Sequence, residues 1–147
     1  AYSAQVHAAT DITGFGLLGH LSEMLAKGQG ADIAAMSVPA LPEALDTLAA
    51  GYRSSLAPAH DKMLTGRVQF DAALPQARRA LLSDPQTGGG LLLAVDATVA
   101  AAILQSAAVT GESWAVIGRV RDGGTSGRRW RLDSALRPER VPTPDLL

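Results

Sequence analysis

The sequence has no cysteine among its 147 residues. Disulfide bonds, zinc sites built on cysteine and a cysteine nucleophile are therefore excluded within this chain. It also has no run of about 18 apolar residues, so no transmembrane helix is expected. No positively charged and then apolar signal segment opens the chain, and we therefore expect a cytoplasmic protein.

A large excess of charge of either sign is also missing. The formal net charge is −1, which gives no general attraction to nucleic acid or to a membrane. Seven arginines do gather between residues 119 and 140, against three acidic residues. We interpret them as a solvated face and do not expect nucleic-acid binding. With 47% hydrophobic and 18% charged residues, the composition indicates one globular domain over residues 1–147.

The spacing of apolar residues predicts strands that alternate with helices. Helices are expected over residues 17–27, 43–50, 75–82 and 97–108. Strands are expected over residues 4–11, 32–38, 67–70 and 91–95, the last of them central because it is the most apolar. Residues 52–63 are expected to form a polar loop with room for one helical turn, and residues 113–121 and 128–132 a terminal hairpin. This alternation indicates an α/β or α+β fold.

The most informative segment, the first motif, runs from Thr10 to His20 and reads TDITGFGLLGH. Asp11 lies between two threonines and precedes three glycines at the start of a predicted helix. A carboxylate suits Mg²⁺, which takes one or two carboxylates together with phosphate oxygens and waters. Glycines let the backbone approach a ligand, and a helix N-terminus favours anions. The alternative is that Asp11 and Thr13 only cap the helix. His20 lies near the apolar stripe and is expected to be a core or interface histidine.

The same glycines also have the spacing of a dinucleotide-binding fingerprint, with Asp32 downstream. We do not favour this interpretation. The acidic residue that binds the ribose lies at the far end of the second strand in that fold, whereas Asp32 opens its predicted strand. Asp11 would also repel a pyrophosphate unless a cation lay between them.

A second motif runs from Asp84 to Leu92 and reads DPQTGGGLL. It precedes a strand and lacks the Gly-Lys-Ser/Thr ending, so it is not a P-loop. Its glycines could direct several backbone N–H groups toward one anion, with Gln86 and Thr87 as further donors. The alternative is a tight turn where one backbone crosses another, with Asp84 and Thr87 satisfying it. The sequence leaves both open.

Both motifs resemble the C-terminal domain of selenophosphate synthetase (selenide, water dikinase), a relative of aminoimidazole ribotide synthetase. The first motif matches the family pattern without a break, and the second matches except that Gly88 stands where serine is usual. The likeness continues through residues 114–120. His60 stands where the family usually has asparagine at the end of a loop, which leaves the function of that loop undetermined.

The resemblance implies an α+β fold, with a mixed β-sheet flanked by helices and distantly ferredoxin-like. It also implies an enzyme that converts ATP, selenide and water into selenophosphate, AMP and phosphate. The family carries its cysteine or selenocysteine, a lysine and most ATP contacts on an N-terminal domain, which we expect to lie outside this chain. We therefore expect no catalytic residue and no activity in the chain alone, and a homodimeric parent whose interface lies mainly on that other domain.

By the same resemblance, Asp11 helps to hold Mg²⁺ beside carboxylates of the N-terminal domain. The residues expected to line the phosphate cleft are Thr10, Thr13, Gly14, Phe15, Gly16, Asp84, Gln86, Thr87, Gly88 and Gly89. Two other functions stay open. One is an ATP-using enzyme of the same superfamily in purine or thiamine synthesis, and the other is a non-catalytic interaction module.

Overall fold

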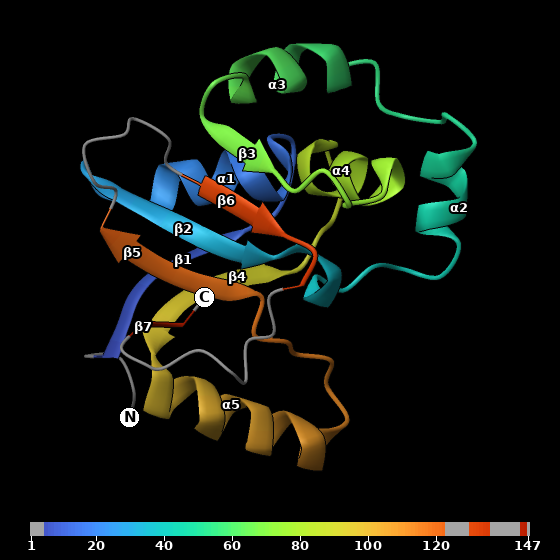
Figure 1. The fold of residues 1–147 in the computed structure, drawn as a ribbon. Coiled ribbons are helices and arrows are strands. Elements are labelled where there is room, and N and C mark those ends of the chain that lie inside the picture. The colour runs from blue at the N-terminus through green and yellow to red at the C-terminus, as the bar shows by residue number, and fades with distance from the viewer. Residues whose placement is uncertain (1–4, 123–129, 136–144, 147) are drawn as a thin grey trace.

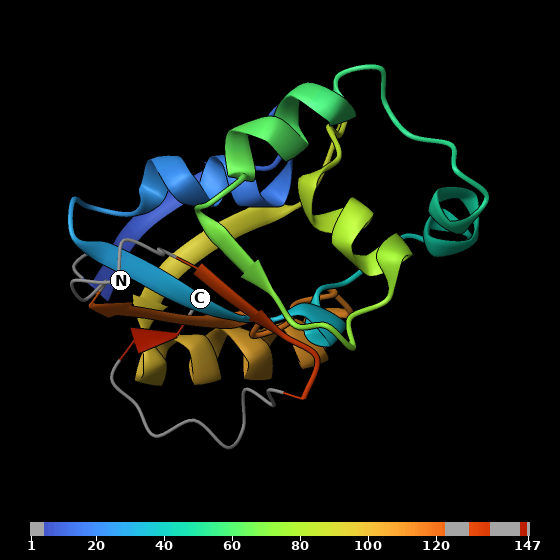
Figure 2. The same ribbon diagram turned by 45° about the horizontal axis from the view of Figure 1, so that its top comes forward.

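A computed structural model describes residues 5–122, 130–135 and 145–146. In this part of the chain seven strands form one sheet, which has helices on both faces (Figures 1 and 2). The strands are β1 (Val6–Asp11), β2 (Gln29–Ala34), β3 (Val68–Phe70), β4 (Leu91–Asp96), β5 (Gly118–Asp122), β6 (Trp130–Asp133) and β7 (Asp145–Leu146). The helices are α1 (Gly16–Met24), α2 (Ala44–Ala49), α3 (Ala57–Leu64), α4 (Gln76–Ser83) and α5 (Ala97–Thr110), with a 3₁₀ turn, η2, at Ala35–Ser37.

The sheet is mixed, and its strand order is β1-β4-β7-β5-β2-β6-β3. β6 runs parallel to both β2 and β3, whereas the other pairs are antiparallel. α1, α3 and α4 lie on one face of the sheet and α5 on the other (Figure 2). α1 lies in the connection from β1 to β2, and α5 lies in the connection from β4 to β5. The predicted α+β fold with a mixed sheet flanked by helices is confirmed.

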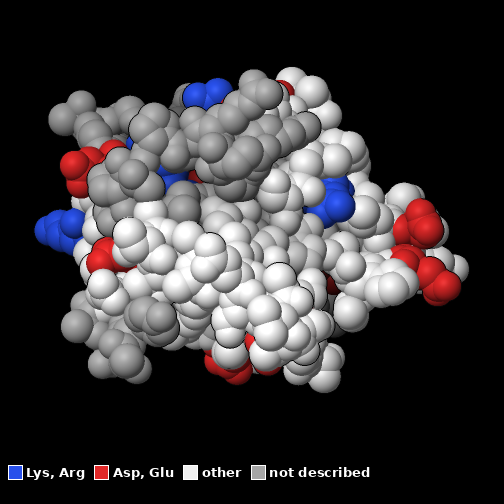
Figure 3. Space-filling model, turned by 90° about the horizontal axis from the view of Figure 1, so that it is seen from below, with Lys and Arg blue, Asp and Glu red and all other residues white. Residues whose placement is uncertain are grey.

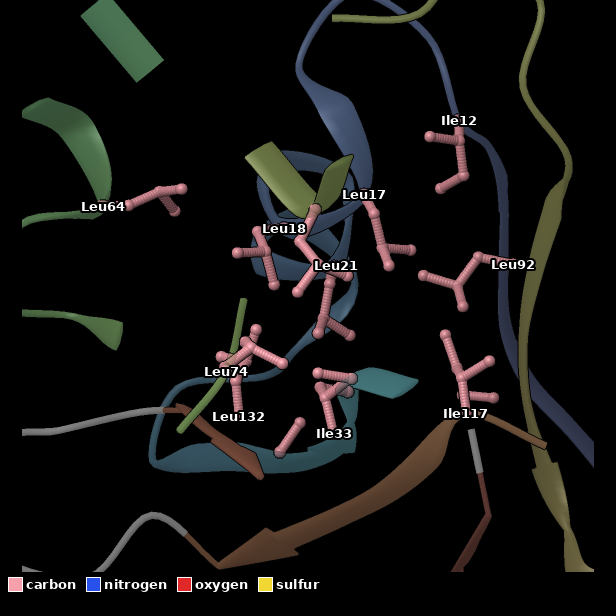
Figure 4. Close-up of a cluster of buried hydrophobic side chains, with 14 residues drawn as sticks. Ile12, Leu17, Leu18, Leu21, Ile33, Leu64, Leu74, Leu92, Ile117 and Leu132 are labelled. Carbon is pink, nitrogen blue, oxygen red and sulfur yellow. The ribbon is translucent and has the colours of Figure 1, made fainter. Parts of the chain in front are cut away.

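The main core lies between the sheet and α1 (Figure 4). α1 contributes Leu17, Leu18 and Leu21, whose spacing places them on one helix face. Leu18 and Leu21 are fully buried, as are Ile33 of β2 and Leu132 of β6. This packing fixes the start of α1 against the sheet, and therefore fixes the first motif.

The predicted terminal hairpin is wrong. β5 and β6 do not pair with each other, because β2 lies between them and pairs with both. Ala31, Ile33 and Ala34 of β2 are fully buried, which is typical of an interior strand. The expected turn after Asp122 lies outside the described residues. β4 has a partner on each side, as an interior strand should, although it lies second from the edge of the sheet.

Several boundaries also differ from the prediction, since α1 ends at Met24 and β5 begins at Gly118. The strand expected over 32–38 begins earlier and ends at Ala34, where the chain turns into the 3₁₀ segment η2. The expected polar loop over 52–63 contains the helix α3 instead. Only Ala57, His60 and Leu64 of this helix are buried, so its apolar face was too narrow to reveal a helical period.

α5 contains no charged residue and covers the lower face of the sheet in Figure 1. Seen from below, the described surface is mostly uncharged, with acidic side chains toward its edges (Figure 3). None of the helices in the described part of the chain is both long and apolar enough to cross a bilayer.

Candidate functional site

The two motifs meet where β1 ends and β4 begins. Asp11, the last residue of β1, lies opposite Leu91, the first residue of β4. Just beyond this pair, the N–H of Ile12 donates to the carbonyl of Gly90 at 2.9 Å, and the N–H of Gly89 donates to the carbonyl of Ile12 at 3.0 Å. The end of the first strand is therefore bonded directly to the glycines of the second motif.

A second set of contacts joins the turn of the first motif to the start of the second. The N–H of Gln86 donates to the carbonyl of Thr13 at 3.0 Å. Gly16 adopts a φ of +65°, and a Cβ at this position would lie 2.8 Å from the carbonyl oxygens of both Ser83 and Asp84. The first motif therefore rests on the backbone of the second, and two segments far apart in sequence form one site.

The carboxylate of Asp11 is exposed and makes no hydrogen bond or ion pair with the described residues. The capping alternative is wrong, because the N-cap of α1 is Phe15 and no side chain caps the helix. The hydroxyl of Thr13 lies 3.1 Å from Nε2 of His20 instead, and the hydroxyl of Thr10 donates to the carbonyl of Asp11 at 3.2 Å. Asp11 is thus a free carboxylate beside a backbone that other bonds hold in place.

Asp84 lies in a very different environment. Its Oδ1 is 3.4 Å from Nε of Arg53, and its Oδ2 accepts a hydrogen bond of 3.2 Å from the N–H of Ser54. The Asp84 carboxylate therefore holds the backbone in place through these contacts. This is the role that Asp84 would have if the second motif were a tight turn. Arg53 and its other partner, Asp61, were not identified from the sequence.

Two buried histidines flank Phe15, whose side chain is half exposed. The Phe15 ring centroid lies 5.6 Å from that of His20 and 6.2 Å from that of His60. His20 is 7% exposed, which confirms the expected core histidine. His60 is buried as well, and its Nδ1 lies 3.2 Å from the carbonyl of Ser83. The departure at position 60 therefore lies against the Phe15 ring of the first motif and contacts the backbone just before the second motif.

The remaining residues of the second motif differ in exposure. Thr87 and Gly88 are exposed, and a Cβ on Gly88 would meet nothing within 4 Å. A serine would therefore fit at position 88, so packing does not require the glycine. Gln86 instead borders a cavity of about 480 Å³ between β4 and residues 112–117. Glu112 is the one charged residue in its lining, which is otherwise mostly aliphatic, so the cavity is unsuited to phosphate.

The structure also excludes the dinucleotide-binding interpretation. In that fold the two strands of the unit are neighbours, but β1 and β2 lie far apart in the sheet order. Asp32 forms ion pairs with two arginines of β5, at 2.8 Å to Arg121 and 3.5 Å to Arg119. Both arginines are half-buried. These two of the arginines between residues 119 and 140 therefore form ion pairs between β2 and β5 and do not belong to a free basic face.

In the described residues, no three histidine, aspartate or glutamate side chains gather closely enough to bind a metal ion. Among the described residues, Asp11 is therefore the free carboxylate at this site. Such a donor set fits Mg²⁺ only if other carboxylates, phosphate oxygens or waters complete it.

Residues 1–131 match the family model of the AIR synthase related protein, C-terminal domain. The chain belongs to this family. Both motifs lie within the matched residues, and so does the whole site described above.

Three curated relatives share the name selenide, water dikinase. The protein of Pelobacter propionicus is 45% identical over 117 residues, covering 78% of this chain and 34% of the relative. That of Agathobacter rectalis is 37% identical over 119 residues, covering 81% of this chain and 35% of the relative. That of Myxococcus xanthus is 37% identical over 126 residues, covering 81% of this chain and 34% of the relative. The chain spans about a third of the length of the curated relatives it matches.

Proposed function

We propose that the chain is the C-terminal domain of a selenophosphate synthetase. The reaction would convert ATP, selenide and water into selenophosphate, AMP and phosphate. The observation that carries the proposal is the meeting of the two motifs beside the unpaired carboxylate of Asp11. The identity of 37% to 45% with selenide, water dikinases over most of the chain supports the choice of reaction.

In this proposal Asp11 contributes one ligand to Mg²⁺ that is bound to the phosphates of ATP. When bound, the ion would neutralise phosphate charge and orient the transferred group. Asp11 suits this role because its carboxylate is exposed and forms no competing ion pair with the part of the chain that the structure describes. α1 begins inside the first motif, and the positive end of its dipole would favour the same anion.

The other groups of the motifs would form one wall of the cleft. Gly14 and Gly88 have open space around them, so a ligand could approach their backbone closely. The remaining wall, further carboxylates and the nucleophile would come from an N-terminal domain. Closure of the two domains would keep bulk water from taking the phosphoryl group that is meant for selenide. We therefore expect the 147 residues alone to form no AMP from ATP and selenide.

The test is ³¹P NMR of the full-length parent with Mg²⁺, ATP and selenide, beside its Asp11→Asn variant. We expect a selenophosphate signal with AMP in the parent. The variant should lose about 3 kcal/mol of transition-state stabilisation, which is more than a hundredfold in rate. Asp46→Asn, which changes an exposed carboxylate on α2, is the matched control and should retain full activity.

Two results would contradict parts of the proposal. If the folded, ATP-binding parent makes no selenophosphate, the substrate is that of another ATP-using member of the superfamily. If the parent makes selenophosphate and Asp11→Asn makes it equally fast, then Asp11 does not bind the metal. A domain used only for docking would give full activity in every variant of the two motifs.

A further inference from the structure

Arg53, which lies outside both motifs, is at the centre of a polar cluster. Its Nη1 donates to Oδ2 of Asp61 at 2.8 Å, and its Nη2 donates to Oδ1 of the same carboxylate at 3.1 Å. Nη2 also donates to the hydroxyl of Ser83 at 3.2 Å, and Nε faces Asp84 at 3.4 Å. One guanidinium thus contacts α3, the end of α4 and the first residue of the second motif.

The partners of Arg53 are bonded to one another as well. The hydroxyl of Ser83 donates to Oδ1 of Asp61 at 3.0 Å, and Ser83 is 2% exposed. The Arg53 hydrogen bonds hold the pKa of the Asp61 carboxyl below its usual value. The two carboxylates that pair with Arg53 outweigh its single positive charge, so the cluster would not attract a phosphate.

The cluster acts on the backbone that supports the first motif. The carbonyl oxygens of Ser83 and Asp84 are the atoms against which Gly16 packs. A shift of these carbonyls would move Gly16, and the bonds of Gln86 and Gly89 to the first motif would have to follow. Ile12, whose carbonyl accepts the bond from Gly89, is the residue next to Asp11 in the chain.

We propose that Arg53 is a positioning residue, which holds residues 83–84 in place and thereby sets the position of Asp11. Arg53 does not touch the ligand in this proposal, and it acts through Asp84 and Ser83. The effect of this positioning on catalysis rests on the proposed function, whereas its effect on the contacts between the two motifs can be measured on the chain alone.

The first experiment measures hydrogen exchange of the Gln86 and Gly89 amides in the 147-residue chain and in Arg53→Met. Exchange is compared at urea concentrations that give all proteins the same global stability. We expect the protection of both amides to fall at least tenfold in the variant. Arg79→Met is the matched control, because Arg79 also donates three hydrogen bonds, to carbonyls at the opposite end of α4.

Arg79→Met should leave the protection of the two amides unchanged at equal global stability. The proposal is wrong if Arg53→Met keeps the protection of the original chain, or if Arg79→Met loses as much. Should Arg53→Met fail to fold, Asp61→Asn gives the same test, because it removes the charge that orients Arg53 and changes a residue that is half exposed.

The second experiment measures the rate and the Mg²⁺ requirement of the full-length enzyme. Arg53→Met should lower kcat at least tenfold and raise the Mg²⁺ concentration for half-maximal rate, while Arg79→Met should change neither. If a folded Arg53→Met variant keeps its kcat and its Mg²⁺ requirement, Arg53 does not position Asp11 for catalysis, and that part of the proposal is wrong. If the parent makes no selenophosphate at all, the proposed function fails, and the exchange experiment still decides whether Arg53 positions the motifs.

Discussion

Replacing Gly16 with alanine tests the contact between the two motifs most directly. The φ of +65° costs about 1–2 kcal/mol for a residue with a Cβ. The new Cβ would also lie 2.8 Å from two backbone carbonyl oxygens, which cannot rotate away as a flexible side chain could. Overpacking of this kind costs about 1–3 kcal/mol. Together these terms predict a loss of roughly 2–5 kcal/mol in the free energy of unfolding.

Gly14→Ala is the matched control, because it makes the same change in the same motif where a Cβ would meet nothing within 4 Å. It should change stability by less than about 0.5 kcal/mol. Urea unfolding gives the difference, and the melting temperature of Gly16→Ala should fall by roughly 5–15 °C. Equal stability of the two variants would refute the packing of the first motif against residues 83–84.

The core, the acid stability and the sheet give three further predictions. Leu18→Ala should lower the free energy of unfolding by about 2–5 kcal/mol in urea, whereas Leu41→Ala, at a residue 78% exposed, should change it by less than about 0.5 kcal/mol. Because the pKa of Asp61 is lowered in the fold, its carboxylate stabilises the fold above the ordinary pKa near 4, and this contribution is lost as the pH falls through the lower folded value. Asp61→Asn should therefore flatten the acid side of a profile of unfolding free energy against pH. An unchanged profile would argue against the ion pair of Asp61 with Arg53. Asp32→Ala leaves two half-buried arginines without their shared partner and should lower the free energy of unfolding, measured by thermal unfolding, by about 1–3 kcal/mol. An unchanged free energy of unfolding would mean that water replaces the carboxylate.

Local patterns were enough to predict the elements that position the site. The apolar spacing of α1 and the apolar run of β4 both led to correct elements, because each buries a continuous face or strand. The hairpin prediction failed because sequence neighbours were assumed to be sheet neighbours. β2 is buried on both sides and takes both later strands as partners, and nothing local to residues 113–132 indicates that choice.

The same limit explains which site residues the sequence could reveal. Asp11, Gly16 and Gly89 lie inside motifs whose composition indicates close backbone approach. Arg53 and Ser83 carry no such local signal, because their role depends on contacts between segments that only the fold brings together. An arginine followed eight positions later by an aspartate does not by itself predict an ion pair.

Asp11 and Asp84 look alike in sequence, since each opens a segment with a threonine and several glycines. The structure separates them by their partners. Asp84 is tied to Arg53 and to the N–H of Ser54, so a metal ion would have to displace an ion pair to reach it. Asp11 has no such partner among the described residues, and its backbone is fixed through Ile12. A metal ligand benefits from this combination, because a held backbone limits the entropy lost on binding and a free carboxylate needs no competing contact to be broken. The proposal that Asp11 binds the metal therefore rests on the contacts of Asp84 as much as on those of Asp11 itself.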